Sequence, residues 1–247
     1  MTTGTDTLIY RRADVYHDFY QGRGKDYRGE ARAVLALVRE RAPRAMSLLD
    51  VACGTGAHLR ELSGSFEEAA GVDLSPEMLA VAARNNPALP LHQGDMRDFR
   101  LGRRFSAVTC MFSSIGYLET AADLRQAVRN LAGHVEPGGV LVVEPWWFPD
   151  TFLTGWVGAD VVSVEGRTIS RVSHSVREGS ASRMEVHYTV AAPETGIEHF
   201  TDTHVMSLFD RETYEAAFRE AGLEPHYTRD DPAGPGVFVA VREGAPA

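Results

Sequence analysis

The chain has 247 residues, with 25 basic and 34 acidic side chains and a formal charge of −9. This length suits one α/β domain with a full core, and the negative charge disfavours a nucleic-acid partner, because phosphate binding rests mainly on lysine and arginine. Residues 1–6 are polar and lack the pattern of a secretory leader, and no apolar run is long enough to cross a bilayer, so we expect a cytoplasmic protein without a membrane partner.

Residues 1–45 are expected to form a lid and a helix. The segment 8–29 is rich in tyrosine around a short basic stretch, and it is too aromatic for a disordered tail. We therefore expect it to fold over another part of the protein. Apolar residues at a spacing of three and four over residues 26–41 predict a helix that ends near Pro43.

Residues 46–147 are expected to form the cofactor-binding core, in which strands and helices alternate. Ser75 and Pro76 predict a helix start, since serine caps the first turn and proline needs no N–H there. Another helix has an apolar stripe around Leu124, and a turn at residues 137–139 leads into the next strand. The alternation predicts a parallel sheet with helices on both faces. The predicted strands are residues 46–51, 69–72, 90–93, 105–112 and 140–144.

The pattern changes in residues 151–209. Residues 168–177 and 182–190 alternate apolar and polar side chains around a turn, which predicts an antiparallel hairpin, and residues 199–209 predict another strand of that layer. The α/β pattern then resumes in residues 210–242, with a helix that Asp210 caps and a final strand. We expect the antiparallel block to be an insertion within one domain, near the strand ends where substrates bind.

The octapeptide LDVACGTG at residues 49–56 contains the end of the first strand and the turn after it, and Asp73 follows the second strand. A turn of small residues lets backbone N–H groups approach a ligand closely, and the carboxylate can accept two hydrogen bonds from a ribose diol. A dinucleotide-binding turn needs a third glycine, but position 59 is leucine. The acidic loop that contains Asp95 and the tail Cys-Gly-Thr-Gly instead favour S-adenosylmethionine. Asp50, the acid at the end of the first strand, belongs to the same pattern, although it could instead only tie down its own turn. Asp95 could likewise only cap a helix.

These elements resemble the class I methyltransferases over nearly the whole chain. The resemblance implies a Rossmann-like α/β fold, with a mostly parallel seven-stranded sheet and an antiparallel β insertion in one domain, residues 1–247. It also implies that the glycine turn faces the amino-acid part of the cofactor, Asp73 the ribose, Asp95 and Met96 the adenine, and Met111 the sulfonium. The full set expected to bind S-adenosylmethionine is Tyr16, Tyr27, Asp50, Ala52, Gly54, Gly56, Asp73, Leu74, Asp95, Met96 and Met111.

Longer strings narrow the family: GRGKDY (22–27), GDMRDF (94–99), CMFSSIG (110–116), VEPWWFP (143–149) and SRVSHS (170–175). They resemble the N,N-dimethyltransferases of antibiotic deoxysugar pathways, which twice methylate the amino group of a dTDP-linked amino-deoxyhexose. Trp146 and Trp147 would supply aromatic surface; as neighbours on a strand they are expected to face opposite ways, one in the core and one in the pocket. The residues expected to bind substrate are Tyr10, Arg23, Lys25, Ser114, Trp146, Trp147, Arg171 and His174.

Two departures from the family pattern bear on the substrate. The pattern has a histidine after Ser-Ser-Ile-Gly, where this chain has Tyr117, and an arginine where it has Pro235. A proline cannot bind the diphosphate. Either another basic residue binds it, with Arg23, Lys25, Arg171 and Arg229 as candidates, or the substrate sits differently. An amine at C4 instead of C3, or a different nucleotide sugar, would be compatible with both changes.

Methyl transfer to a neutral amine creates little net charge, so most of the acceleration can come from holding the reactants together. A hydrogen-bond acceptor near the amine can orient its lone pair and pass its proton to solvent. Tyr117 is the catalytic candidate by position. Glu144 is the charged alternative, although it could instead orient neighbouring backbone. His174 could equally be a structural histidine on its strand.

Two other functions stay open at this point: a methyltransferase for another small amine or hydroxyl acceptor, and a catalytically silent regulator that binds S-adenosylmethionine. The complete cofactor set argues against the second. A homodimer is possible, although no interface can be predicted. Cys53 and Cys110 lie in apolar contexts, so we expect buried thiols and no metal site.

Overall fold

The computed structural model describes residues 7–229 and 234–244, and the N-terminal residues 1–6 lie outside this described part. The larger sheet is mostly parallel, as predicted; its strand β11 alone runs antiparallel to its neighbours β10 and β5. In spatial order its strands are β10 (Glu224–Thr228), β11 (Val237–Val241), β5 (Val135–Val143), β4 (Phe105–Cys110), β1 (Ser47–Val51), β2 (Glu68–Asp73) and β3 (Leu91–Gln93).

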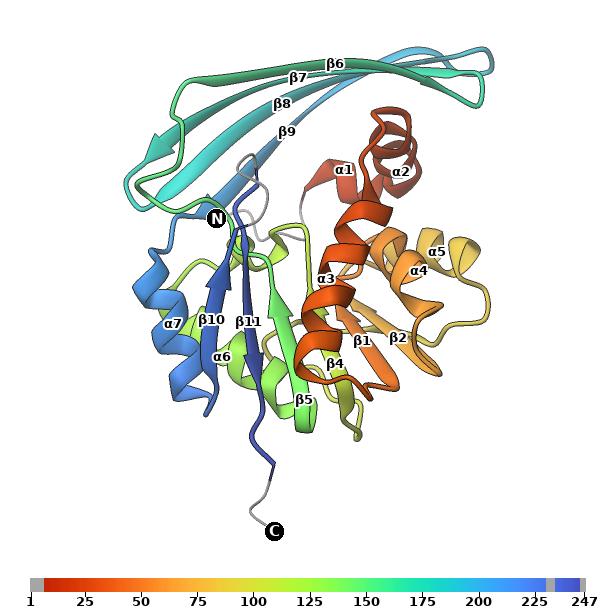
Figure 1. Ribbon diagram of the computed structural model, residues 1–247. Coiled ribbons are helices and arrows are strands. Elements are labelled where there is room, and N and C mark those ends of the chain that lie inside the picture. Colours follow the sequence, from red (N-terminus) through yellow and green to blue (C-terminus); the bar gives the residue numbers. More distant parts are fainter. Residues whose placement is uncertain (1–6, 230–233, 245–247) are drawn as a thin grey trace.

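Helices cover both faces of this sheet (Figure 1). On one face lie α6 (Ala121–Gly133) and α7 (Arg211–Glu220), and on the other lie α3 (Tyr27–Arg41), α4 (Ala57–Ser63) and α5 (Pro76–Asn85). The predicted caps are present, because Ser75 Oγ accepts from Met78 N at 3.2 Å and Asp210 from Thr213 N at 2.8 Å. None of the described helices is long and apolar enough to cross a bilayer.

A second, antiparallel sheet follows β5. Its strands are β6 (Trp156–Val164), β7 (Arg167–Glu178), β8 (Ala181–Ala192) and β9 (Gly196–Ser207), in that order. This sheet lies across one end of the larger sheet, with α1 (Leu8–Arg11) and α2 (Ala13–Gly22) beneath it (Figure 1). Phe19 of α2 is buried in one apolar cluster with Ile169 and Val186 of the sheet. The aromatic N-terminal segment therefore folds against the insertion.

The structure corrects several predicted boundaries. β4 ends at Cys110, because Phe112 and Ser113 have left-handed φ values of 56° and 58° that no strand contains. β5 begins at Val135, ahead of the glycine turn, and its pairing with β4 shifts register to accommodate that turn. β6 and β10 are absent from the prediction. β6 exposes valines on its outer face, which hides its alternation, and β10 is a polar edge strand that contains a proline.

Candidate active site

A cavity of about 1080 Å³ lies where the two sheets meet. Its floor is formed at the carboxyl ends of β1, β2, β4 and β5, with Asp50, Asp73, Met111 and Glu144 in the lining. Its roof includes Arg171 from the inner face of the antiparallel sheet. Open α/β sheets bind their ligands at this edge, so the fold places the candidate site where the sequence predicted it.

The glycine turn after β1 presents its backbone to the cavity. Gly54 and Gly56 have positive φ values of 55° and 74°, and a Cβ at Gly56 would come within 2.4 Å of Asn86 Nδ2. Glycine is therefore required at position 56. Asp73 accepts hydrogen bonds from Gly54 N at 2.7 Å and from Ser75 N at 2.9 Å. Its carboxylate joins the two loops and retains lone pairs for hydroxyl ligands.

Asp50 is buried beneath this turn. Its carboxylate accepts a hydrogen bond from Thr109 Oγ1 on β4 at 2.8 Å, and burial raises the pKa of Asp50 to about 6. Asp50 lines the cavity, and its bond to Thr109 joins β1 to β4 just before the turn.

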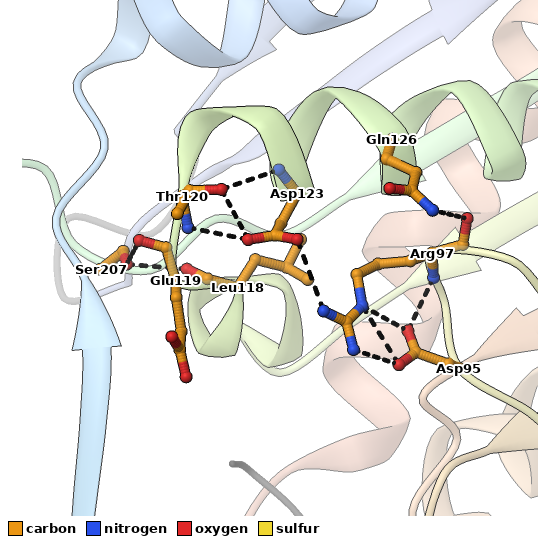
Figure 2. Close-up of polar contacts among 8 residues, drawn as sticks. All are labelled: Asp95, Arg97, Leu118, Glu119, Thr120, Asp123, Gln126 and Ser207. Carbon is orange, nitrogen blue, oxygen red and sulfur yellow. Dashed lines mark hydrogen bonds and ion pairs between the residues drawn. The ribbon is translucent and has the colours of Figure 1, made fainter. Parts of the chain in front are cut away.

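Asp95 is held by an arginine of its own loop. Arg97 donates to both carboxylate oxygens of Asp95 and reaches Asp123 in the first turn of α6 (Figure 2). Burial alone would raise the pKa of Asp95, but the hydrogen bonds from Arg97 lower it. Thr120 caps α6 and exchanges hydrogen bonds with Asp123 (Figure 2). The loop is therefore a fixed wall, with Asp95 and Met96 in the cavity lining.

The remaining residues predicted to bind the cofactor come from separate segments of the chain. Met111 is buried and also packs in the core beside α3, whereas Leu74 is 40% exposed. All of them line the cavity: Tyr16, Tyr27, Ala52, Leu74, Met96 and Met111. The structure thus brings the predicted cofactor set to one cavity except for Gly56, which is not in the lining and where a Cβ would instead meet Asn86.

The residues predicted to bind substrate line the same cavity, with one exception. Those in the lining are Tyr10, Arg23, Lys25, Ser114, Trp146, Trp147 and Arg171. His174 is exposed, because it lies three residues from Arg171 on β7 and faces the opposite side of the sheet. The structure therefore places His174 outside the cavity.

The two tryptophans correct a further expectation. Both line the cavity and both are half-buried, so neither packs in the core as predicted. The reason is that β5 ends at Val143, and the irregular segment beyond it does not alternate like a strand. Trp146 Nε1 donates to Ser182 Oγ on β8 at 2.8 Å, which ties this segment to the antiparallel sheet.

Two of the basic side chains in the cavity are already paired with carboxylates. Arg23 lies 3.3 Å from Asp160, and Lys25 lies 2.5 Å from Glu30. Arg229, another candidate for the diphosphate, lies 5.9 Å from the ring of Trp147 and is not in the cavity lining. These pairings leave little uncompensated charge on Arg23 and Lys25.

Arg171 differs from these residues because it is both buried and without a carboxylate. It is 8% exposed, and its guanidinium donates to Ser173 Oγ at 3.0 Å and approaches Met184 Sδ at 3.4 Å. Across residues 7–229 and 234–244, no carboxylate pairs with it, and its Nε has no hydrogen-bond partner. A buried cation without a counter-charge is energetically costly, so this guanidinium is suited to bind an anion.

Tyr117 belongs to a hydrogen-bonded chain of three side chains. Its hydroxyl oxygen lies 2.6 Å from Tyr10 Oη and 2.6 Å from His204 Nδ1. All three side chains line the cavity. Burial raises the pKa of Tyr10 and of Tyr117 far above the ordinary value of a phenol. Both phenols therefore stay protonated at neutral pH and act as hydrogen-bonding groups.

Glu144 holds the left-handed turn that ends β4. Its carboxylate accepts from Phe112 N at 2.9 Å and from Ser113 Oγ at 3.1 Å. Burial raises the pKa of this carboxyl group. These contacts correspond to the backbone-orienting role that the sequence analysis gave as the alternative for Glu144.

Part of the cavity wall is missing from the sequence prediction. Tyr20, Met184, Tyr188 and His204 all line it. His204 lies two residues from the buried Asp202 on β9, so both side chains face the same side of the sheet. This alternation identifies His204 as a cavity residue only once it is known which side of the sheet is covered. The aromatic residues could have been found from the tyrosine-rich segment and the alternation of β8.

Residues 48–139 match the family model of a methyltransferase domain. The dTDP-3-amino-3,4,6-trideoxy-alpha-D-glucopyranose N,N-dimethyltransferase of Streptomyces venezuelae is 60% identical over 229 residues, which are 93% of this chain and 97% of that protein. This chain belongs to the family of dTDP-amino-sugar N,N-dimethyltransferases. The resemblance inferred from its sequence strings is thereby confirmed.

Solved structures agree with the family. The crystal structure of DesVI from Streptomyces venezuelae has a TM-score of 0.89 and 58% identity, covering 95% of this chain and 98% of that one. CalS10 of Micromonospora echinaspora, an amino pentose methyltransferase solved with bound S-adenosylmethionine, has a TM-score of 0.84 and 47% identity, covering 92% and 96%. The N,N-dimethyltransferase described here is an S-adenosylmethionine-dependent enzyme with the predicted class I methyltransferase fold.

The site of this N,N-dimethyltransferase fits its cofactor. A Cβ at Gly54 would meet no atom of the described protein within 4 Å, so the turn is open there, and the Asp73 carboxylate retains acceptor capacity beside it. Cys53 and Cys110 are buried and unbridged. Within the described ranges, no group of histidine, cysteine and carboxylate side chains could hold a metal ion.

Proposed function

We propose that this enzyme methylates the amino group of a dTDP-amino-deoxyhexose twice. The observation that carries the substrate class is Arg171, a buried cation that lies in the cavity of an acidic protein and has no carboxylate partner among the described residues. A diphosphate would accept the hydrogen bonds that the Arg171 guanidinium does not make within the protein. A guanidinium can donate two parallel hydrogen bonds to a pair of phosphate oxygens. Arg171 would thus supply the charge that Pro235, itself in the lining, cannot. Trp146 and Trp147 offer aromatic surface to the sugar or the thymine ring.

In the mechanism we propose, Gly54 and Asp73 hold the cofactor at the turn that Gly56 shapes, and the aromatic side chains exclude water from it. When bound, S-adenosylmethionine supplies an electrophilic methyl group on a sulfonium. Tyr10 and Tyr117 orient the substrate amine by accepting hydrogen bonds from its N–H groups, which leaves the nitrogen lone pair free. The rate acceleration comes from holding the amine and the methyl group in a near-attack orientation, because protonated phenols are not strong bases.

The test is mass spectrometry of the purified enzyme with S-adenosylmethionine and a panel of dTDP-3-amino and dTDP-4-amino deoxysugars. We expect a gain of two methyl groups on one of them, which also gives the position of the amine. A free amine or a hydroxyl substrate methylated in preference to every nucleotide sugar would favour the alternative acceptor. Tight cofactor binding without turnover of any acceptor would favour the silent regulator.

Replacing Tyr117 by phenylalanine is expected to lower kcat about tenfold, because the variant loses one hydrogen bond that orients the amine. The Kd for S-adenosylmethionine, measured by calorimetry, is expected to stay within twofold. Tyr214→Phe is the matched control, since it removes the hydroxyl of a buried α7 side chain that packs in the core outside the cavity lining. Full activity of Tyr117→Phe would contradict the assigned role.

We also propose that the enzyme acts in the cytoplasm on a soluble nucleotide sugar and has no nucleic-acid or membrane partner. Its acidic composition supports the first exclusion, because a −9 chain repels polyanions. A homodimer is compatible with the family, and light scattering of the purified enzyme would measure its mass directly.

A further inference from the structure

The chain Tyr10–Tyr117–His204 joins three elements that are distant in sequence. Tyr10 belongs to α1, Tyr117 to the short 3-10 helix Ser114–Tyr117, and His204 to β9. Each hydroxyl-to-neighbour distance is 2.6 Å, and all three side chains line the cavity. His204 is 6% exposed. No role follows for this histidine from the sequence pattern or from the cofactor site.

The positions of these three hydrogen-bonded side chains are held by contacts of neighbouring residues on β9. Ser207 Oγ, three residues beyond His204, donates to the carbonyl groups of Leu118 and Glu119, which directly follow Tyr117 (Figure 2). These contacts of Ser207 keep β9, and with it the His204 imidazole, next to Tyr117. On the other side, Ile9 N donates to Asp202 at 2.8 Å, which anchors the helix of Tyr10 to the same strand.

The protonation state of His204 Nδ1 controls how the two phenol protons are arranged. If His204 Nδ1 is unprotonated, Tyr117 donates to it, Tyr10 donates to Tyr117, and the lone pairs of Tyr10 Oη face the cavity. If His204 Nδ1 carries a proton, it donates to Tyr117, and the hydroxyl proton of either Tyr10 or Tyr117 is left without a place between the three groups and can point into the cavity. The protonation state of one imidazole nitrogen thus decides whether the cavity presents an acceptor or a donor.

The surroundings of His204 favour the neutral imidazole. Burial and, to a smaller extent, the positive charge of Arg171 together lower its pKa to about 4. The titratable or charged groups that face it are Tyr10, Tyr117, Arg171 and, on its own strand, Asp202, whose carboxylate is engaged with the Ile9 N–H. Its partner on β8 is the neutral Met184. The imidazolium, which would be a donor at both nitrogens, is therefore excluded at neutral pH.

We propose that His204 is a positioning residue for methyl transfer: its Nδ1 accepts the Tyr117 hydroxyl proton, which sets the chain so that an acceptor oxygen of Tyr10 faces the substrate amine. An amine N–H that donates to Tyr10 leaves the nitrogen lone pair free to attack. A phenol proton that points into the cavity would instead donate to that lone pair and block it. This inference rests on the proposed amine substrate, and it assigns the histidine no proton of the reaction itself.

Kinetics of four variants test the proposal: His204→Leu, His204→Asn, Tyr117→Phe and the double variant Tyr117→Phe/His204→Leu. We expect His204→Leu to lower kcat about tenfold, with the KM for the amino sugar and the cofactor Kd within twofold. His204→Asn retains an acceptor near the position of Nδ1 and is expected to recover most of the lost turnover. The double variant should be no slower than the slower single variant, because both changes break one chain.

A kcat of His204→Leu within twofold of the wild type would overturn the proposal, and so would a double variant whose losses multiply. Imidazole NMR of the wild type, with nitrogen-15 in its histidines, decides the question without turnover or a folded variant. The lowered pKa of His204 keeps the imidazole neutral from about pH 5 to pH 8. The proposal places the single ring proton on Nε2, so a protonated Nδ1 in that range contradicts it. If no amino sugar is methylated, the proposed substrate fails, and this spectrum still decides the tautomer.

Discussion

Replacing Asp73 by alanine is expected to weaken S-adenosylmethionine binding by about 2–3 kcal/mol, which is a rise in Kd of about 30- to 150-fold. Two losses contribute to this change. The variant lacks the carboxylate that is proposed to accept the ribose diol, and the N–H groups of Gly54 and Ser75 lose their acceptor. The glycine turn that should hold the other end of the cofactor is thus loosened at the same time.

Titration calorimetry of the apo enzyme with S-adenosylmethionine measures this effect. Asp98→Ala is the matched control, because Asp98 is exposed and lies outside the cavity lining. Its Kd is expected to equal that of the wild type. An unchanged Kd in Asp73→Ala would refute the ribose assignment. A thermal melt of both variants separates loss of the ligand contact from loss of the fold.

Arg171→Met is expected to raise the KM for the nucleotide sugar at least 30-fold, since a charge-assisted contact to phosphate contributes about 2 kcal/mol or more. The Kd for S-adenosylmethionine should not change. The free energy of unfolding is expected to stay the same or to increase, because the variant removes a buried cation that has no carboxylate partner in the described chain. A purely structural arginine would show the opposite pattern, with a less stable protein.

Calorimetry with dTDP and with thymidine makes the result specific to the diphosphate. In the wild type, dTDP is expected to bind more tightly than thymidine, and in Arg171→Met the difference should disappear. Arg183→Met on the neighbouring strand β8 is the control, since Arg183 pairs with Glu185 away from the cavity. If Arg171→Met keeps the full preference for dTDP, another group binds the diphosphate and the assignment is wrong.

His174 and Arg171 show how far the pattern of a strand can be read. Both lie in one string that resembles the family, yet residues three apart on a strand face opposite sides. Alternation therefore already indicates that the two side chains cannot share one pocket. It does not indicate which of them faces the pocket, because that depends on what the sheet covers. The packing of α1 and α2 beneath the sheet decides this in favour of Arg171.

The sequence by itself determined the parallel sheet, the caps at Ser75 and Asp210, and the glycine turn with Asp73, since these depend on local periodicity and on the chemistry of single turns. Only the tertiary structure decided which basic residue is left unpaired and which histidine stands behind Tyr117. Those answers depend on contacts between residues such as Arg23 and Asp160, or Tyr10 and Tyr117, which lie more than a hundred positions apart. No local pattern encodes such a contact, because it exists only when two distant elements pack together.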